Sequence, residues 1–339
     1  MCMACELLQG LDLEALSPPE GLPRHPLQFP DGLGSSRYAD WLPGEGAPRA
    51  GGLRRYPPPR SNRHWHPEAL QNLIPALASA GTDGVPQLGI AAAAIEDFRY
   101  VWAAKLNGQV APDARFIVAL PTPYSLLAGL PPETFSHELL ARLEQCVASE
   151  IATLVDTVPP EELAVQWDVC GETRVWESRG RSLAAARDLP ERLLQSFVVL
   201  SAAVPPQAEI GWHFCNRGVQ GTESSEAHDS AQVTRLAGAI IASTDREPAF
   251  VHIPVPAGRD DAGYYTPLAN LGLWPAMDVY LGLVHEGDDV EAAWRRLFAA
   301  SSVLGRVGIA PACGADPSAV RLVLEQLLRR AAGDVPPGD

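Results

Sequence analysis

Histidine and cysteine residues follow short apolar runs in the second half of this chain. His213 and Cys215 lie two residues apart at the end of one run, and Cys313 follows another run far downstream. Imidazole nitrogen and thiolate sulfur both suit Zn²⁺, and a catalytic zinc keeps one position open for substrate. A pair at i and i+2 that leaves a strand end can direct both side chains at one ion. The three residues are therefore the best candidates for a zinc site, although the motif taken alone is more typical of structural, hydrogen-bonded histidine and cysteine.

Four other polar residues occupy the same position, at or just past the end of an apolar run: Thr122, Asp168, His252 and His285. In a (β/α)8 barrel the C-terminal ends of the parallel strands converge on one end of the barrel, and active sites lie there. We therefore expect these side chains to lie near the predicted zinc site.

Segments with helical periodicity alternate with the apolar runs. We expect helices over residues 91–107, 136–158, 189–203, 229–243, 290–300 and 316–332. We expect strands buried on both faces over residues 116–120, 163–167, 208–212, 250–253, 279–284 and 307–310. This alternation predicts an α/β fold with a parallel sheet, and the strand-end residues favour a (β/α)8 TIM barrel. The two strands still needed are expected near residues 27–29 and 87–90.

The chain contains 29 glycine and 32 proline residues, which are densest in its first part. Such residues are typical of turns and loops. We expect residues 1–85 to form an irregular Pro/Gly-rich N-terminal extension that packs on the barrel. Residues 86–333 form the catalytic barrel in this interpretation, and residues 334–339 form a disordered tail.

The charge balance argues against several classes of protein. The 339 residues include 41 acidic and 26 basic ones, which gives a net charge of −15. Binding to nucleic acid needs clustered Lys and Arg, and a membrane span needs ~18 consecutive apolar residues; neither is present. The N-terminus lacks the basic and apolar regions of a signal peptide. We therefore expect a cytoplasmic protein whose six cysteines are not a disulfide framework. A homodimer is compatible with a barrel of this size.

Five short motifs occur in a fixed order along the chain. They are Leu120-Pro121-Thr122-Pro123, Gln166-Trp167-Asp168, His213-Phe214-Cys215, residues 279–285 and Ala312-Cys313-Gly314. In this order they resemble the catalytic domain of cobalamin-independent methionine synthase, within the uroporphyrinogen decarboxylase/methionine synthase-like barrel superfamily. Residues 166–170, 252–256 and 281–285 look closest to a single-domain branch of that superfamily.

The resemblance implies a role for each matching residue. His213, Cys215 and Cys313 match zinc ligands, His285 matches the proton donor to the leaving group, and Asp168 matches the acid that holds the substrate amino group. The implied activity is a zinc-dependent methyl or alkyl transfer, in which a zinc-activated thiol attacks an alkyl donor. The expected partner is a small thiol or an amino-acid-like substrate.

The chain departs from the family pattern at two positions. Pro254 stands where the synthase has a glutamate ligand, so either His252 replaces it or the zinc has only three protein ligands. Asp168 is followed by Val169 where the synthase has a second acid. We therefore expect a relative of methionine synthase with a different substrate. The alternative activity is a lyase or decarboxylase, with zinc polarising a carbonyl group or absent, and a non-catalytic barrel that carries a thiol or metal is a further alternative.

Overall fold

The computed structural model describes residues 88–108, 110, 112–127, 136–178, 189–215, 230–273, 276–313, 315 and 317–331. The expected N-terminal extension over residues 1–85, the C-terminal tail over residues 334–339 and the strand near residues 27–29 lie outside the described residues.

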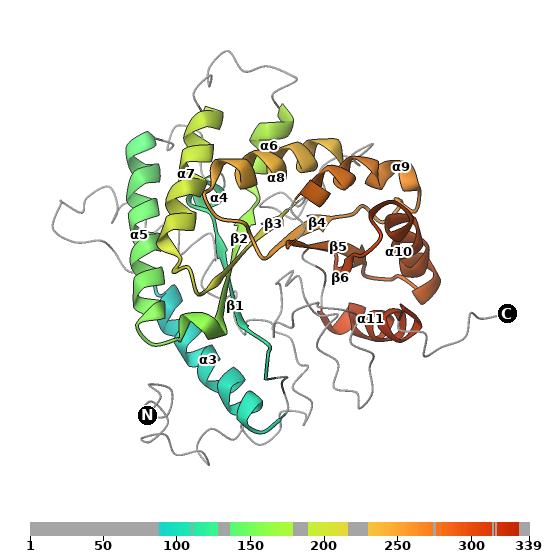
Figure 1. Ribbon diagram of the computed structural model, residues 1–339, viewed down its shortest axis with the longest axis horizontal. Coiled ribbons are helices and arrows are strands. Elements are labelled where there is room, and N and C mark those ends of the chain that lie inside the picture. Colours follow the sequence, from blue (N-terminus) through green and yellow to red (C-terminus); the bar gives the residue numbers. More distant parts are fainter. Residues whose placement is uncertain are drawn as a thin grey trace.

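Six parallel strands form one sheet, and their order in the sheet follows their order in the chain (Figure 1). They are β1 (Phe116–Pro121), β2 (Leu163–Val169), β3 (Glu209–Phe214), β4 (Phe250–Pro254), β5 (Asp278–Val284) and β6 (Gly308–Pro311). Each corresponds to a predicted strand. This sequential parallel order is that of a (β/α)8 barrel. Within the described part of the chain no strand joins β6 to β1, so the sheet is consistent with six of the eight strands of a barrel and is not a closed one.

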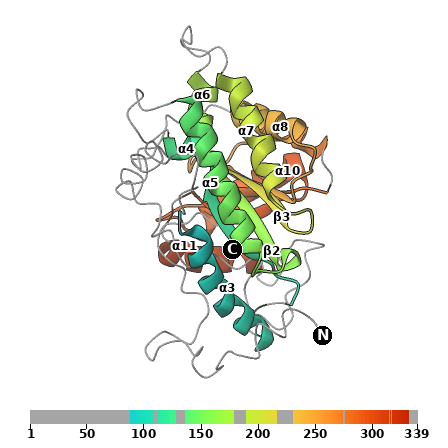
Figure 2. The ribbon, with the colours of Figure 1, turned by 90° about the vertical axis from the view of Figure 1, so that its left-hand side faces the viewer.

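Helices connect the strands and cover one face of the sheet. They are α3 (Ile90–Leu106), α4 (Pro123–Leu127), α5 (His137–Val155), α6 (Gly171–Ser178), α7 (Leu189–Ala203), α8 (Ala231–Ser243), α9 (Ala262–Tyr265), α10 (Val290–Leu304) and α11 (Pro317–Ala331). Two 3₁₀ helices, η3 (Pro160–Glu162) and η4 (Thr266–Leu273), complete the described elements. Helices α3, α5, α7 and α8 contact one another in sequence around the sheet (Figure 2). None of the described helices combines the length and apolar character that crossing a membrane requires.

The prediction of a strand over residues 87–90 is wrong, because Leu88 and Gly89 directly precede helix α3, which begins at Ile90. The carboxylate of Glu150, on α5, accepts hydrogen bonds from the backbone N–H groups of Leu88, Gly89 and Ala91, the last at 2.7 Å. Ala91 belongs to the first turn of the helix, where N–H groups have no partner within the helix and a negative charge is favourable, while Leu88 and the N-cap residue Gly89 directly precede that turn. Gly89 has φ = 76°, which is incompatible with continuing a strand. A contact with a residue 59 positions away thus determines the start of α3.

Two aromatic rings fill the space beside two glycines on the sheet face opposite the helices. A Cβ atom at Gly211 would lie 2.0–2.3 Å from carbon atoms of the Phe250 ring, and Gly308 has the same relation to Tyr280. The Phe250 and Tyr280 rings are fully buried and pack edge to face, with centroids 6.3 Å apart. Their small apolar cluster also contains Ile117, Ala164 and Ala310.

We predict that Gly211→Ala lowers the free energy of unfolding by about 1–3 kcal/mol, because a methyl group there overpacks a buried site. Urea denaturation of the full chain measures this change. Gly263→Ala is the matched control, since the nearest atom to its new Cβ is a carboxylate oxygen of the more exposed Asp261, at 3.1 Å. Replacing the Phe250 ring with the smaller leucine side chain, in the double variant Gly211→Ala/Phe250→Leu, should restore part of the lost stability. Equal stability of Gly211→Ala and the wild-type protein would contradict the prediction.

Candidate metal centre

Strand β3 supplies two of the three predicted zinc ligands. His213 lies within the strand and is only 3% exposed, while Cys215 follows its last residue. The backbone N–H of Cys215 donates to the carbonyl of Val169 at 3.1 Å, so the pairing of β3 with β2 continues past the end of the strand. The i, i+2 spacing places both side chains on the same face of the sheet.

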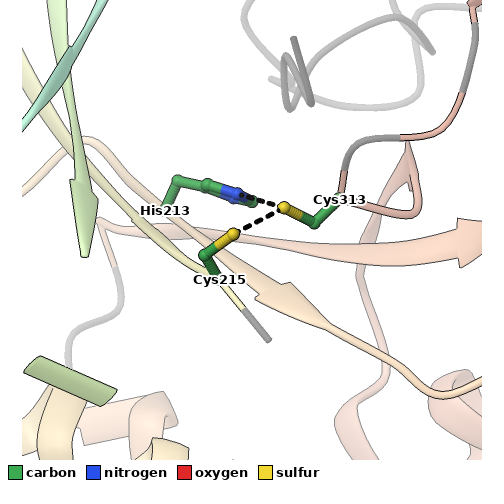
Figure 3. A group of neighbouring side chains, drawn as sticks. All are labelled: His213, Cys215 and Cys313. Carbon is green, nitrogen blue, oxygen red and sulfur yellow. Dashed lines mark hydrogen bonds between the residues drawn. The ribbon is translucent and has the colours of Figure 1, made fainter. Parts of the chain in front are cut away.

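Strand β6 supplies the third predicted ligand. The N–H of Ala312 donates to the carbonyl of Val284 at 2.7 Å, and Cys313 follows directly. The donor atoms of His213, Cys215 and Cys313 all lie within 4.8 Å of one another. His213 Nε2 is 3.3 Å from Cys313 Sγ, and the sulfur atoms of Cys215 and Cys313 are 2.8 Å apart (Figure 3). The structure therefore brings these three side chains together at one end of the sheet.

This convergence requires a curved sheet. Strands β3 and β6 are separated by β4 and β5. Neighbouring strands lie about 4.8 Å apart, so three spacings in a flat sheet would place β3 and β6 about 14 Å apart. Side chains of His213 and Cys313 meet at 3.3 Å because the sheet bends toward their face. Such bending is what a barrel interior provides.

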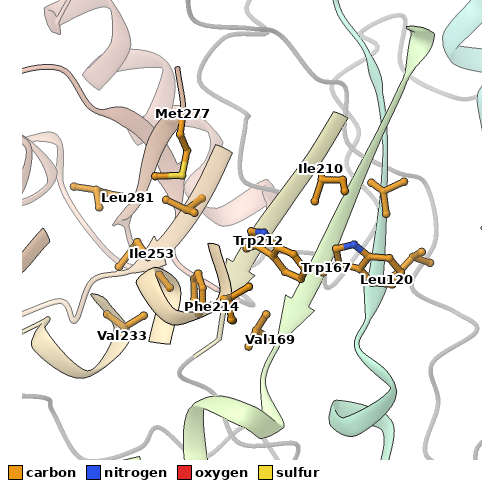
Figure 4. Packing of buried hydrophobic residues seen from close by; sticks show 14 of the residues in the cluster. Leu120, Trp167, Val169, Ile210, Trp212, Phe214, Val233, Ile253, Met277 and Leu281 are labelled. Carbon is orange, nitrogen blue, oxygen red and sulfur yellow. The ribbon is translucent and has the colours of Figure 1, made fainter. Parts of the chain in front are cut away.

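The opposite faces of the strands hold this arrangement in place (Figure 4). Trp212 and Phe214, the chain neighbours of His213, are buried in the main apolar core together with Trp167 and Val169 of β2. The Trp212 ring packs edge to face on Phe197 of α7, with centroids 5.3 Å apart. Because successive side chains of a strand alternate between faces, packing of these residues under the helices fixes His213 on the other face.

The donor set fits a divalent zinc ion. One imidazole nitrogen and two sulfur atoms are typical zinc ligands, and a sulfur ligand must be a thiolate. Hydrogen bonds from Cys170 and Cys313, together with the charge of His213, hold the pKa of the Cys215 thiol well below its usual range despite its burial. Burial alone would lower the pKa of His213, but its hydrogen bond with Cys215 and the charge of Asp168 outweigh this effect and raise it.

Asp168, near the end of β2, pairs in register with His213. Its Oδ1 accepts a hydrogen bond from Gln166 Nε2 at 2.9 Å. Removal from water raises the pKa of the Asp168 carboxyl group to about 6, against the opposing effect of the His213 charge. The structure thus places Asp168 beside the donor group, with its pKa raised toward neutral pH.

His252, the suggested replacement for the missing glutamate, lies beside the donor group and not within it. It pairs in register with His213, and the two rings are 4.3 Å apart between centroids. It is fully buried, and neither ring nitrogen has a hydrogen-bond partner within the described part of the chain. Burial and the His213 charge hold the pKa of His252 well below its usual range, so the ring is neutral. Its nitrogens do not belong to the group of donor atoms that lie within 4.8 Å of one another.

His285 and Thr122 follow strands at the same edge of the sheet but do not join the donor group. His285 follows β5, and its backbone N–H donates to Asp288 Oδ2 at 2.7 Å. Thr122 follows β1, and its hydroxyl group donates to Ser125 Oγ at 2.8 Å. Both residues are placed by local turns.

Cys170 is the site residue that the sequence analysis did not assign. It follows β2 in the same way that Cys215 follows β3, but its sulfur is not among the donor atoms that all lie within 4.8 Å of one another. The neighbouring Cys215 and burial raise the pKa of the Cys170 thiol well above its usual range. The signal in the sequence is the repeated spacing of Asp168-Val169-Cys170 and His213-Phe214-Cys215, which become aligned because β2 and β3 pair with Asp168 opposite His213.

No protein-family model matches the sequence, and no curated protein matches it. A Listeria monocytogenes protein assigned as a vitamin-B12-independent methionine synthase shares 17% identity with this chain at a TM-score of 0.45, over 72% of this chain and 70% of that one. A B12-independent methionine synthase from a Shewanella species, solved in complex with selenomethionine, shares 15% identity at a TM-score of 0.45. That match covers 70% of this chain and 64% of the Shewanella protein. Proteins of the B12-independent methionine synthase type are therefore distant structural neighbours of this chain.

Proposed function

We propose that this protein is a zinc-dependent methyl- or alkyltransferase that acts on a small thiol substrate. The observation that carries the proposal is the meeting of His213, Cys215 and Cys313 at the C-terminal ends of β3 and β6, with all donor atoms within 4.8 Å of one another. A His-Cys-Cys set leaves a fourth tetrahedral position. The kind of reaction comes from the motifs around these residues, which resemble those of cobalamin-independent methionine synthase.

In this proposal the residues at the site have separate roles in metal binding and substrate binding. A zinc ion held by His213, Cys215 and Cys313 would keep a bound substrate thiol deprotonated at neutral pH. Asp168 binds the amino group of an amino-acid-like thiol, since its carboxyl group has a pKa of about 6 and is charged at pH 7. The carboxylate then orients the substrate for in-line attack on the alkyl donor.

His285 is the proposed general acid. A departing group in alkyl transfer needs a proton, and histidine is the side chain that changes its charge between about pH 5 and 8. His285 follows β5 at the same edge of the sheet as His213 and Asp168. The residue is half-buried, and its backbone N–H donates a hydrogen bond to Asp288 that fixes the turn carrying the imidazole.

Metal analysis of the purified full chain, followed by cobalt substitution, tests the proposal. We expect one zinc ion per chain, and we expect homocysteine, cysteine or 2-mercaptoethanol to change the visible spectrum of the cobalt form. The Cys146→Ser variant is the control, because Cys146 is buried in a separate apolar cluster with Leu126 and Leu127. Absence of metal binding would favour a metal-free decarboxylase. A bound metal whose spectrum no thiol changes would favour a lyase in which the metal polarises a carbonyl group.

A further inference from the structure

We infer that Glu172, acting through the hydroxyl group of Ser125, is a positioning residue for Asp168. The inference rests on the proposed function, in which Asp168 binds the amino group of the thiol substrate. Glu172 lies in the first turn of α6, close behind the end of β2, and its side chain is only 2% exposed. A carboxyl group at such a depth is costly unless a specific partner holds it. The partner of Glu172 is Ser125.

The end of β2 is fixed from the neighbouring strand end. The carbonyl group of Asp168 accepts a hydrogen bond at 3.3 Å from the backbone N–H of Thr122, which follows β1. The chain then turns around one buried hydroxyl group, because the N–H groups of Cys170 and Gly171 both donate to Ser125 Oγ at 3.0 Å. Ser125 lies on the short helix α4, which contacts α6. A single side chain therefore holds the backbone on the C-terminal side of Asp168.

Glu172 determines the direction in which the Ser125 hydroxyl group donates. A serine hydroxyl group has one hydrogen and two acceptor lone pairs. Two acceptors lie within reach of Ser125 Oγ: a carboxylate oxygen of Glu172 at 2.8 Å and the carbonyl oxygen of Asp168 at 3.2 Å. The hydrogen goes to the carboxylate, which is the nearer and the stronger acceptor. The lone pairs of the same oxygen are then free to accept from the N–H groups of Cys170 and Gly171.

The direction of the Asp168 carboxylate depends on this turn. Asp168 is the last residue but one of β2 and lies opposite His213 in the pairing with β3. Gln166 Nε2 donates to Asp168 Oδ1 at 2.9 Å, and the backbone bonds described above hold the other side of the residue. Without the Glu172 acceptor, the Ser125 hydroxyl group would donate to the Asp168 carbonyl and release the turn. Misplacement of a substrate-holding group by about 1 Å is enough to lower a rate ~100-fold.

Two thiols of equal length test the inference on the cobalt-substituted full chain. Cysteamine ends in an ammonium group, which Asp168 would bind, whereas 2-mercaptoethanol ends in a hydroxyl group. Glu172→Ala should lower the affinity for cysteamine at least ~10-fold, which is the contribution of one hydrogen bond to a charged group. The affinity for 2-mercaptoethanol should stay unchanged, with one cobalt still bound per chain. Titrations followed in the visible spectrum measure both dissociation constants.

Conservative and second-site variants separate positioning from folding. Glu172→Gln keeps an acceptor oxygen for the Ser125 hydroxyl group and should restore most of the cysteamine affinity. Ser125→Ala removes the hydroxyl group itself and should reproduce the selective loss, which gives a second variant if Glu172→Ala does not fold. Glu144→Ala is the matched control: Glu144 is 5% exposed and pairs with Arg192 at 2.7 Å, between α5 and α7. It should lose stability and keep the wild-type affinity for cysteamine.

The outcomes distinguish the inference from the proposed function. Wild-type affinity for cysteamine in both Glu172→Ala and Ser125→Ala would overturn the inference and leave the proposed function intact, as would an equal loss of affinity for the two thiols. Asp168→Asn is the reference for complete loss of the ammonium contact. If it leaves cysteamine binding unchanged, the role of Asp168 and the inference are both wrong. A wild-type chain that binds no cobalt, or whose cobalt spectrum neither thiol changes, would overturn the proposed function itself.

Discussion

Replacing Cys313 with serine should abolish tight zinc binding by the full chain. Cys313 contacts both other ligands, with its sulfur 3.3 Å from His213 Nε2 and 2.8 Å from Cys215 Sγ. A serine hydroxyl group is not deprotonated at neutral pH, so it does not replace a thiolate ligand. We expect the dissociation constant for zinc to rise beyond the ~10- to 100-fold that follows loss of an outer-shell partner. Competition with a chromogenic chelator measures this constant.

The same substitution should remove the stabilisation that zinc gives to the fold. Zinc held between the ends of β3 and β6 binds the folded state, and at a free zinc concentration of 100 times the dissociation constant this adds about 2.7 kcal/mol. Zinc should therefore raise the midpoint temperature of thermal unfolding for the wild-type chain and for Cys146→Ser. It should leave the midpoint of Cys313→Ser unchanged. If Cys313→Ser gains as much stability from zinc as the wild type does, the three-residue site is wrong.

The elements that position the site could be predicted because their signals are local. Each apolar run between turn residues became a strand, and the last residues of β3 and β6 lie within three residues of the predicted ends. The spacing of His213 and Cys215 is likewise local, since alternation along one strand fixes both on one face. The helix expected over residues 91–107 begins within one residue of the observed start at Ile90, whereas the strand expected over residues 87–90 is absent from residues 88–90. There the carboxylate of Glu150, on another helix, accepts hydrogen bonds from backbone N–H groups that a strand would direct to a neighbouring strand.

The rest of the site depends on contacts between strands that no single segment encodes. Cys170 lies at the strand end next to the donor group because β2 pairs with β3 in one register, and a shift of one residue would change which side chains of β2 face His213. His252 lies opposite His213 in the pairing of β3 with β4, yet whether its ring nitrogens reach a metal depends on how the ring packs. The strand-end position of both residues could be read from the sequence, but their distances from the donor group could not.

Replacing Arg296 with alanine should cause a large loss of stability, about 3–5 kcal/mol, as expected when one partner of a buried ion pair is removed. Arg296, on α10, is 3% exposed and forms an ion pair with Asp288. Its guanidinium group also donates to the carbonyls of Leu283 at 2.8 Å and Ala257 at 2.7 Å. Burial lowers the pKa of Arg296, and the charge of Asp288 opposes that effect. Its removal would leave a largely buried carboxylate and two carbonyls without their partner.

Arg295→Ala is the matched control for urea denaturation, because it removes the same charge from the neighbouring position. Arg295 pairs with Asp260 at 3.2 Å, but its side chain is 60% exposed, and exposed pairs contribute about 0–1 kcal/mol. A similar loss in both variants would contradict a special role for the buried pair.

The Arg296 pair also supports the proposed general acid, because Asp288 Oδ2 accepts the backbone N–H of His285 in addition to the Arg296 ion pair. Asp288→Asn separates the two contributions: the amide oxygen still accepts the His285 N–H, while the ion pair is lost. We expect Asp288→Asn to lose stability yet keep the pH dependence of the transfer reaction, whereas Asp288→Ala should also alter that dependence by releasing the His285 turn. Identical pH profiles for Asp288→Ala and Asp288→Asn would show that the turn does not position His285 for catalysis.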